Sequence, residues 1–173
     1  MLQRGAPEPV PPNTGLRLRA EDAEDLAVIS ACLQDALVSV RDLAYDRQAR
    51  TFVFVANRFR WEGGGAGKRE GAPFERTLCG VAFDEIDAVV YRGFHRSEEE
   101  RILSLLAIRL IPGQPPARAG VPGIAPAGGM IDLEFAGGAT IRLTGSAIRC
   151  RALDFGEPWP TPWQPGHQLD EPQ

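Results

Sequence analysis

The chain has 173 residues, of which 43% are hydrophobic and 24% are charged, and its formal net charge is -4. This length suits a single domain that buries about 70% of its unfolded surface, and no apolar run approaches the ~20 residues that a bilayer span requires. The N-terminal residues lack the apolar block of a secretory signal and the net charge is negative, so we expect a soluble cytoplasmic protein with no membrane or nucleic-acid partner.

The first fifteen residues hold four prolines and no periodic apolar pattern, which predicts a disordered tail over 1–15. We expect one globular domain over 16–157, followed by a Pro/Trp-rich C-terminal strap and tail over 158–173. The domain opens with LRLRA at 16–20, whose alternating apolar and basic residues suit either a short strand or an extended lead-in.

The clearest predicted helix is EDAEDLAVISACLQDALVSV, residues 21–40. Its apolar residues recur at steps of three and four and form one stripe, made of Leu26, Ile29, Leu33, Leu37 and Val40. Acidic residues crowd its first turn, where they favour the positive end of the helix dipole, and Asp22 suits the N-cap. The sequence therefore predicts an N-terminal amphipathic helix that packs on the rest of the domain.

From residue 41 onward the apolar period changes to two, which predicts a strand, a turn at 46–49 and a long strand over 50–62. The first half of the long strand is apolar on both faces, as in a central strand. In its second half two faces alternate, so that one face is wet or paired: Asn57, Phe59 and Trp61 on one side, Arg58 and Arg60 on the other.

A glycine-rich hairpin loop over 63–72 and two strands over 76–83 and 86–94 follow, with a bend between the two strands. The next stretch is ambiguous. Ser97 and Glu100 match a capping box, which predicts a helical turn at 97–101, whereas the apolar run that follows suits a buried strand or a continued helix. We favour the helical turn followed by a strand over 102–111.

Residues 112–129 contain five prolines and five glycines and form either a disordered excursion or a lid. A hairpin over 130–145 with a Gly137-Gly138 turn and a last strand over 147–155 complete the domain. The expected fold is α+β, with the N-terminal helix on an antiparallel meander of six to seven strands that curls into a barrel or sandwich. A pleckstrin-homology-like partial barrel is one form of such a fold.

Several segments together resemble an alphaproteobacterial family known as domain-of-unknown-function family 2948. They span 16–167 and are LQDALVSVRDLAY, NRFRWE, LSLLAIRL, FAGGATIRL and a late PW followed by a proline and a histidine. None of them is a catalytic motif. The resemblance implies a cytoplasmic bacterial protein, and it implies no activity, cofactor or site residue.

The catalytic and metal-binding motifs are missing from the sequence: it contains no GxSxG, HExxH, GxGxxG or GxxxxGK[ST] pattern. Cys32, Cys79 and Cys150 are widely spaced, which predicts buried thiols in a reducing compartment, and a reactive thiol would need one of two histidines as its base. The acidic residues at 84, 85 and 87 suit a solvated turn. We therefore predict no catalytic residue, no metal and no cofactor.

What remains is a polar and aromatic set that could bind an anionic or aromatic group if it converged: Asn57, Arg58, Trp61, Arg92, His95, Trp159 and His167. The alternative is that the tryptophans cover the end of the sheet while the arginines pair with acidic residues. We also expect Trp159 to dock on the sheet as part of the strap.

The favoured function is a non-enzymatic binding or adaptor module that recognises a protein partner or a small anion. Two other functions stay open: an enzyme with its pocket between the sheet arginines and the tail, and a homodimer joined through a sheet edge.

Overall fold

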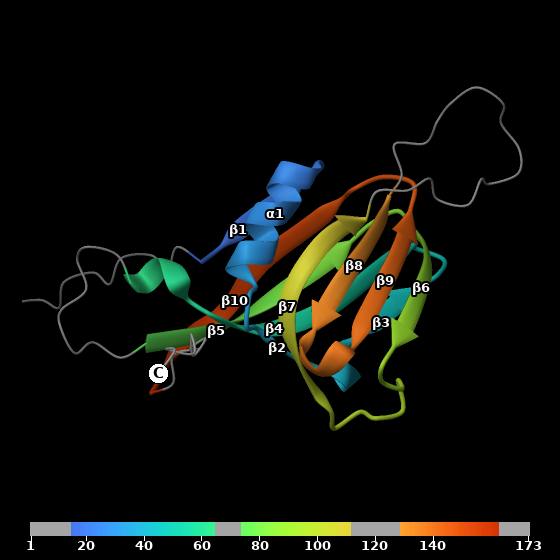
Figure 1. Ribbon diagram of the computed structural model, residues 1–173. Coiled ribbons are helices and arrows are strands. Elements are labelled where there is room, and N and C mark those ends of the chain that lie inside the picture. The colour runs from blue at the N-terminus through green and yellow to red at the C-terminus, as the bar shows by residue number, and fades with distance from the viewer. Residues whose placement is uncertain (1–14, 65–73, 112–128, 163–173) are drawn as a thin grey trace, which may run out of the picture.

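The computed structural model describes residues 15–64, 74–111 and 129–162, which form one helix, ten strands and three short 3-10 helices (Figure 1). In chain order the elements are β1 (Arg17–Ala20), α1 (Ala23–Cys32), β2 (Leu37–Ser39), η1 (Val40–Asp42), β3 (Ala44–Asp46), β4 (Thr51–Phe59), η2 (Trp61–Gly64), β5 (Phe74–Phe83), β6 (Ile86–Arg92), β7 (Ile102–Ile111), β8 (Met130–Phe135), η3 (Ala136–Gly138), β9 (Thr140–Gly145) and β10 (Cys150–Thr161). Within these residues, no helix is both long and apolar enough to cross a bilayer.

All ten strands belong to one antiparallel sheet, in the order β1-β10-β5-β4-β2-β7-β8-β9-β6, with β3 paired to β4. The α+β class and the antiparallel sheet agree with the expectation. The sheet is larger than the predicted six to seven strands. Its end strands β1 and β6 do not pair with each other, so the sheet curls without closing into a barrel (Figure 1).

The predicted simple meander is wrong. β5 and β6 are separated only by a bend at Asp84 and Glu85, yet β5 pairs with β4 and β10, whereas β6 pairs with β9. Glu85 has a φ of 61°, a left-handed conformation that turns the chain out of the ladder at this point. The chain therefore crosses from one half of the curled sheet to the other after β5.

The helix is also shorter than predicted, and it is not the first element of the fold. α1 ends at Cys32, and Leu37–Ser39 form β2, which pairs with both β4 and β7. Asp22 does cap the helix, since its Oδ1 accepts a hydrogen bond from the amide of Asp25 at 2.9 Å. Asp35, in the turn after the helix, has a φ of 61°. Of the last two residues of the predicted stripe, Leu37 begins β2 and Val40 begins η1.

The stretch around 97–111 is resolved in favour of a strand. β7 begins at Ile102 as predicted, but the helical turn at 97–101 is wrong, because these residues form turns outside any helix. The expected capping pair does not form the cap. Instead, the amide of His95 donates to Oε1 of Glu98 at 2.7 Å. The predicted hairpin is confirmed, with Gly137 and Gly138 at φ values of 76° and 79°.

Several predicted bounds differ from the observed ones. β4 ends at Phe59 rather than at 62, β6 ends at Arg92 rather than at 94, and β10 begins at Cys150 and runs through the predicted boundary of the strap as far as Thr161. The tail at 1–15 lies almost wholly outside the described residues. So do most of the loops at 63–72 and 112–129 and the chain after 162.

The two faces of the strands around β10 differ in what they meet. The inner face and α1 enclose the core, whose largest side chains include Phe52, Phe54, Phe83, Phe135 and Leu26. We call the opposite face of β1, β10, β5, β4 and β2 the outer face. In the part of the chain that the structure describes, no helix packs on the outer face.

Candidate functional site

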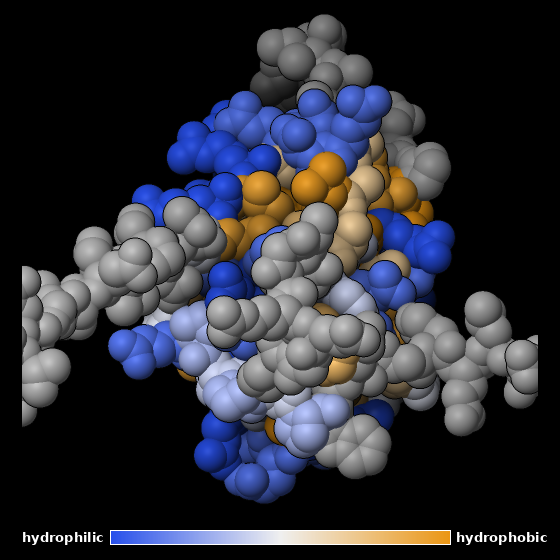
Figure 2. Space-filling view, turned by 90° about the vertical axis from the view of Figure 1, so that its left-hand side faces the viewer, coloured by the Kyte–Doolittle hydropathy of each residue, from blue (hydrophilic) through white to orange (hydrophobic). Residues whose placement is uncertain are grey.

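The outer face of β1, β10 and β5 carries a groove of about 480 Å³. Its lining comes from these three strands and consists of Arg17, Leu18, Arg19, Gly80, Ala82, Arg151, Ala152, Leu153 and Phe155. Figure 2 views the left-hand side of the molecule as drawn in Figure 1, where apolar surface lies among hydrophilic residues. The groove is therefore an apolar hollow with a charged border.

Small residues on β5 form the floor of this groove. Gly80 lies opposite Leu153 and Ala82 lies opposite Arg151 in the register of the two strands. A Cβ atom added at Gly80 would lie 3.7 Å from the ring of Phe155, which is an ordinary contact distance. Glycine at this position thus leaves the groove open beneath the aromatic ring.

The apolar walls come from β10, which exposes its large residues and buries its small ones. Cys150 and Ala152 face the core, whereas Leu153 and Phe155 are 44% and 43% exposed on the outer face. After Phe155 the register with β5 shifts at a bulge that contains Gly156, whose φ is 75°. Exposed apolar side chains of this size, next to one another, are typical of an interaction surface.

Two arginines on β1 border the groove without partners. Among the described residues, no hydrogen bond or ion pair engages the side chain of Arg17 or Arg19, and both are exposed. Arg19 lies directly opposite Arg151 across the β1–β10 ladder. Like charges at directly opposite positions destabilise a sheet. Among the described residues, Arg151 is the member of this pair that forms an ion pair, with Asp84 at 3.0 Å.

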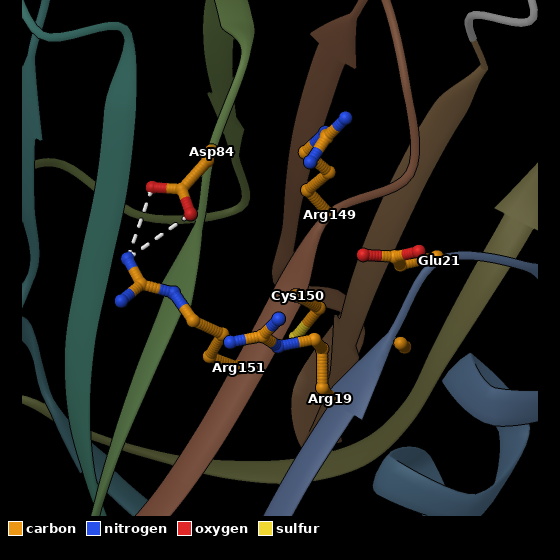
Figure 3. A pocket seen from close by; sticks show the side chains of 7 residues that line it. Arg19, Glu21, Asp84, Arg149, Cys150 and Arg151 are labelled. Atoms are coloured by element: carbon orange, nitrogen blue, oxygen red, sulfur yellow. Dashed lines mark hydrogen bonds and ion pairs between the residues drawn. The ribbon is translucent and has the colours of Figure 1, made fainter.

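Arg19 and Arg151 also line a second, smaller hollow of about 230 Å³ at the Cys150 end of β10 (Figure 3). It adds Arg149, Glu21 and Asp84 to Arg19 and Arg151. Arg149 is paired with Glu85 at 2.8 Å. Acidic residues thus offset part of the positive charge here, and we regard this hollow as an extension of the groove rather than as a separate anion site.

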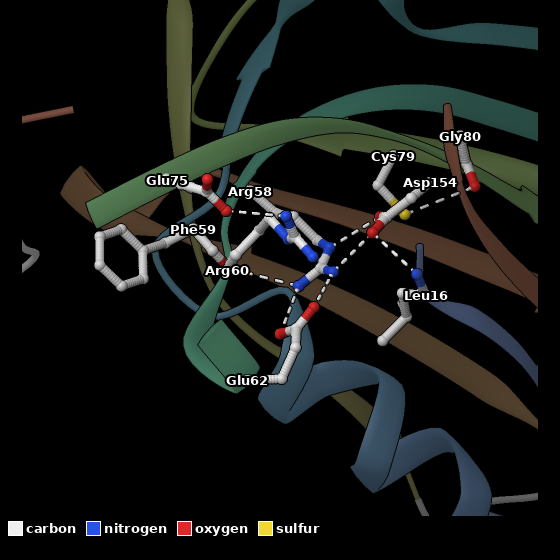
Figure 4. Close-up of polar contacts among 9 residues, drawn as sticks. All are labelled: Leu16, Arg58, Phe59, Arg60, Glu62, Glu75, Cys79, Gly80 and Asp154. Carbon is white, nitrogen blue, oxygen red and sulfur yellow. Dashed lines mark hydrogen bonds and ion pairs between the residues drawn. The ribbon is translucent and has the colours of Figure 1, made fainter. Parts of the chain in front are cut away.

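A buried ion-pair cluster lies on the inner face of the sheet, around Asp154 of β10 (Figure 4). Arg58 is fully buried and donates to Asp154 from Nε at 2.8 Å and from Nη2 at 2.6 Å. It also donates to both carboxylate oxygens of Glu62, with Nη1 to Oε2 at 3.1 Å. Oδ2 of Asp154 accepts a further bond from the amide of Leu16 at 2.9 Å. This cluster fastens β10, β4 and the start of the domain to one another.

The charges of the cluster hold one another ionised. Burial by itself lowers the pKa of the Arg58 guanidinium, but its hydrogen bonds to Asp154 and Glu62 outweigh burial and raise that pKa. Burial likewise tends to raise the pKa of Asp154, yet the hydrogen bonds from Arg58 and Leu16 lower it below its ordinary value. Since every group is satisfied within the cluster, Arg58 is not offered to a ligand.

Several of the sequence-predicted site residues gather at this end of the sheet. The side chain of Arg76 donates to the carbonyl and the Oδ1 of Asn57 at 2.9 and 3.2 Å, and Trp159 of β10 lies opposite Arg76. Trp159 is half-buried within the sheet. Trp61, which begins η2, packs its ring against Phe59 with 4.5 Å between centroids.

The remaining predicted residues lie elsewhere. Arg92 ends β6, at the opposite side of the sheet from η2 in Figure 1, and His95 follows it at an exposed turn. His167 lies outside the described residues. The predicted set is therefore split between β4, η2 and β10 on one side and the end of β6 on the other, and it does not form one pocket among the described residues.

The thiols are free, and two of them are buried as predicted, whereas Cys32 is only half-buried. Burial raises the pKa of Cys79 to about 12 and that of Cys150 to about 12. In the described part of the chain, no three histidine, cysteine, aspartate or glutamate side chains are placed to hold a metal ion.

Sequence reasoning did not select the residues of the groove, although a signal was present. In LRLRA at 16–20 and in IRCRALDF at 148–155, arginines alternate with apolar residues. A period of two places Leu153 and Phe155 on the same face of the strand as Arg149 and Arg151, and Cys150 and Ala152 on the other face. The burial of Cys150 and Ala152 and the exposure of Leu153 and Phe155 follow this pattern.

Comparison with known proteins assigns a family but no activity. A family model described as "Protein of unknown function (DUF2948)" matches residues 16–167. No curated protein and no solved structure matches the chain. A pleckstrin-homology-like form therefore stays a prediction.

Proposed function

This chain belongs to the DUF2948 family of proteins of unknown function, and we propose that it is a non-enzymatic binding module that recognises an acidic, partly apolar segment of a protein partner. The placement of Arg19 carries this proposal. It lies opposite Arg151, has no acidic partner among the described residues and lines the same groove as the exposed Leu153 and Phe155. A carboxylate bound there would relieve the repulsion between the two guanidinium groups.

A protein segment fits this surface better than a small anion does. The exposed apolar surface continues beyond the groove along the outer face, where β4 and β2 present Val53 and Leu37. A small anion would use the arginines and leave this surface uncovered. Apolar contacts with a charged border are the usual composition of a protein interface.

Among the described residues, no comparable observation supports the enzyme alternative. Its pocket would need Arg58, Arg92 and His95 together, but Arg58 is engaged by Asp154 and Glu62, and the other two residues lie at the end of β6. We place the binding module in the bacterial cytoplasm, in keeping with its free cysteines.

Selection from a random peptide display library against the intact protein tests the proposal. We expect enrichment of peptides that combine Asp or Glu with apolar residues. Enrichment should be lost on the Arg17→Ala/Arg19→Ala double variant and reduced on Gly80→Val, which fills the floor of the groove. Arg109→Ala, an exposed arginine on β7, is the matched control and should leave the enrichment unchanged.

Two results would contradict the proposal. One is enrichment of the same peptides on the Arg17→Ala/Arg19→Ala variant, which would move the binding surface elsewhere. The other is the absence of any enriched acidic peptide on the intact protein, combined with saturable binding of a small carboxylate, which would favour a small-ligand module.

A further inference from the structure

We propose that the partner segment binds as an added β-strand along the free edge of β1, with acidic and apolar residues in alternation. This inference rests on the proposed function and adds the conformation and residue pattern of the partner. β1 ends the strand order, and within the described residues β10 is its one strand neighbour. An unpaired edge is a template for a strand from another chain.

The backbone of β1 directs two residues toward this edge. The amide of Asp154 donates to the carbonyl oxygen of Leu16 at 2.9 Å, and the register places Leu18 opposite Ala152. Hydrogen-bonded and non-hydrogen-bonded pairs alternate along an antiparallel ladder. Leu16, Leu18 and Ala20 therefore turn their backbone groups toward β10, and those of Arg17 and Arg19 point to the free edge.

The side chains of β1 determine the pattern of the partner. Arg17 and Arg19 lie on the outer face, where they are exposed and have no acidic partner among the described residues. Leu16 and Leu18 lie on the inner face, half-buried against the core. A strand paired with β1 places every second side chain beside the arginines and the others beside the leucines. Acidic residues fit the first set, and apolar residues fit the second.

The charge of β1 also selects among occupants. A second copy of the chain that paired β1 with β1 would bring arginines opposite arginines, and like charges at such positions are destabilising. The β6 edge offers no matching row of cations, since Asp87 on it pairs with Arg50 at 2.9 Å. We therefore assign the β1 edge to an acidic strand from a different protein.

A synthetic seven-residue peptide that alternates Glu and Val, with both ends blocked, is a suitable probe, measured by calorimetry against the full chain. We expect the alternating order to bind at least tenfold more tightly than a peptide of the same composition with its acids grouped. Replacing every Glu with Lys should abolish binding. The variant Arg17→Glu/Arg19→Glu should bind the Lys peptide more tightly than the Glu peptide. Arg92→Glu on β6 should leave the preference for the Glu peptide unchanged.

Backbone N-methylation separates edge pairing from docking on the face. All strand pairs in this sheet are antiparallel. In an antiparallel addition, residues opposite Arg17 and Arg19 direct their N–H groups toward β1. Methylation of the Glu amides should therefore weaken binding at least tenfold, and methylation of the Val amides, which point away, should have little effect.

The outcomes distinguish the two proposals. If the acidic peptide binds and depends on the arginines, but its order and its methylation pattern have no effect, the edge-strand inference fails and the binding module stands. If no acidic, partly apolar peptide binds, the proposed function itself fails. Dimerisation that Arg17→Glu/Arg19→Glu abolishes would overturn the inference in favour of a second copy. Arg17→Gln/Arg19→Gln serves the same tests if the charge-reversed variant does not fold.

Discussion

Arg58 and Asp154 form a buried, two-bond ion pair between β4 and β10, with β5 between them in the sheet. The side chain of Arg58 has no exposed surface, and that of Asp154 is 5% exposed. A buried ion pair costs desolvation and is weak evidence of net stabilisation, but removal of one partner leaves the other charge without compensation. The pair therefore makes the fold sensitive to single substitutions at either position.

Asp154→Ala is expected to lower the free energy of unfolding by about 3–5 kcal/mol. The substitution leaves the Arg58 guanidinium buried with only Glu62, and it also removes the acceptor of the Leu16 amide. Urea unfolding followed by circular dichroism gives the value. Arg109→Ala, which breaks a pair whose arginine is 64% exposed, is the control and should cost less than ~1 kcal/mol.

The double variant Arg58→Met/Asp154→Leu separates the pair from the packing around it. Because both charges are removed together, we expect it to be more stable than Asp154→Ala. A double variant that is less stable than both single substitutions would show that the pair is a net source of stability.

The same cluster predicts that stability falls in acid. The folded-state pKa of Asp154 and that of Glu62 lie below their ordinary values, because the hydrogen bonds from Arg58 outweigh the opposing effect of burial. The carboxylates therefore contribute stability that is fully present above the unfolded-state pKa values near pH 4. This contribution is lost as the pH falls from there through the folded-state values.

Urea midpoints measured between pH 7 and pH 3 check this dependence. Stability should be nearly constant from pH 7 to pH 5 and should then decline. Asp154→Asn should flatten the acid limb, since it removes one of the two titrating groups. An acid limb with the same slope in Asp154→Asn would assign the decline to other carboxylates.

The thiols are expected to react slowly in the folded protein. Burial raises the pKa of Cys79 and of Cys150 to about 12, so the thiolate fraction of each is very small at pH 8. Cys32 is half-buried, and its pKa is raised as well. Titration with a chromogenic disulfide at pH 8 should show one thiol reacting before the other two.

The same titration in denaturant is the control, and all three thiols of the unfolded protein should then react together. Cys32→Ser should remove the fast phase of the native protein. Rapid reaction of Cys79 in the native state would contradict its burial and would reopen the possibility of a reactive thiol beside Asp154.

The sequence predicted local features well and long-range pairing poorly. The cap at Asp22, the turn at Gly137 and Gly138 and the strand β7 follow from short-range chemistry, since the residues that decide them are neighbours in the chain. The crossing after β5 does not. Which strand lies beside β6 depends on how the whole sheet curls, and Asp84 and Glu85 suit a tight hairpin as well as a crossing.

The candidate site was missed for a related reason. Arg58 was selected because arginine in a strand suggested a ligand site, but its partner Asp154 is distant in the chain. Leu153 and Phe155 are not among the predicted site residues. Their exposure follows from the period of two within β10, which places them on the same face as Arg149 and Arg151.

Two glycines with the same backbone conformation provide a last test of the fold. Gly93 has a φ of 77° and Gly137 has a φ of 76°. A Cβ atom at Gly93 would lie 2.9 Å from the carbonyl oxygen of Gly138 and 3.0 Å from the Cα of Ala139. At Gly137 an added Cβ meets no heavy atom of the described residues within 4 Å. An alanine at either position would thus have the same backbone strain, but only the one at Gly93 would have too little space for its methyl group.

Gly137→Ala should therefore cost only the strain of a left-handed alanine, ~1–2 kcal/mol. Gly93→Ala should cost at least about 1 kcal/mol more, since backbone of the β8–β9 hairpin must shift to admit the methyl group. Thermal unfolding of the two variants, measured side by side, gives the difference. Equal melting temperatures would mean that the turn after β6 does not lie against the β8–β9 hairpin as described.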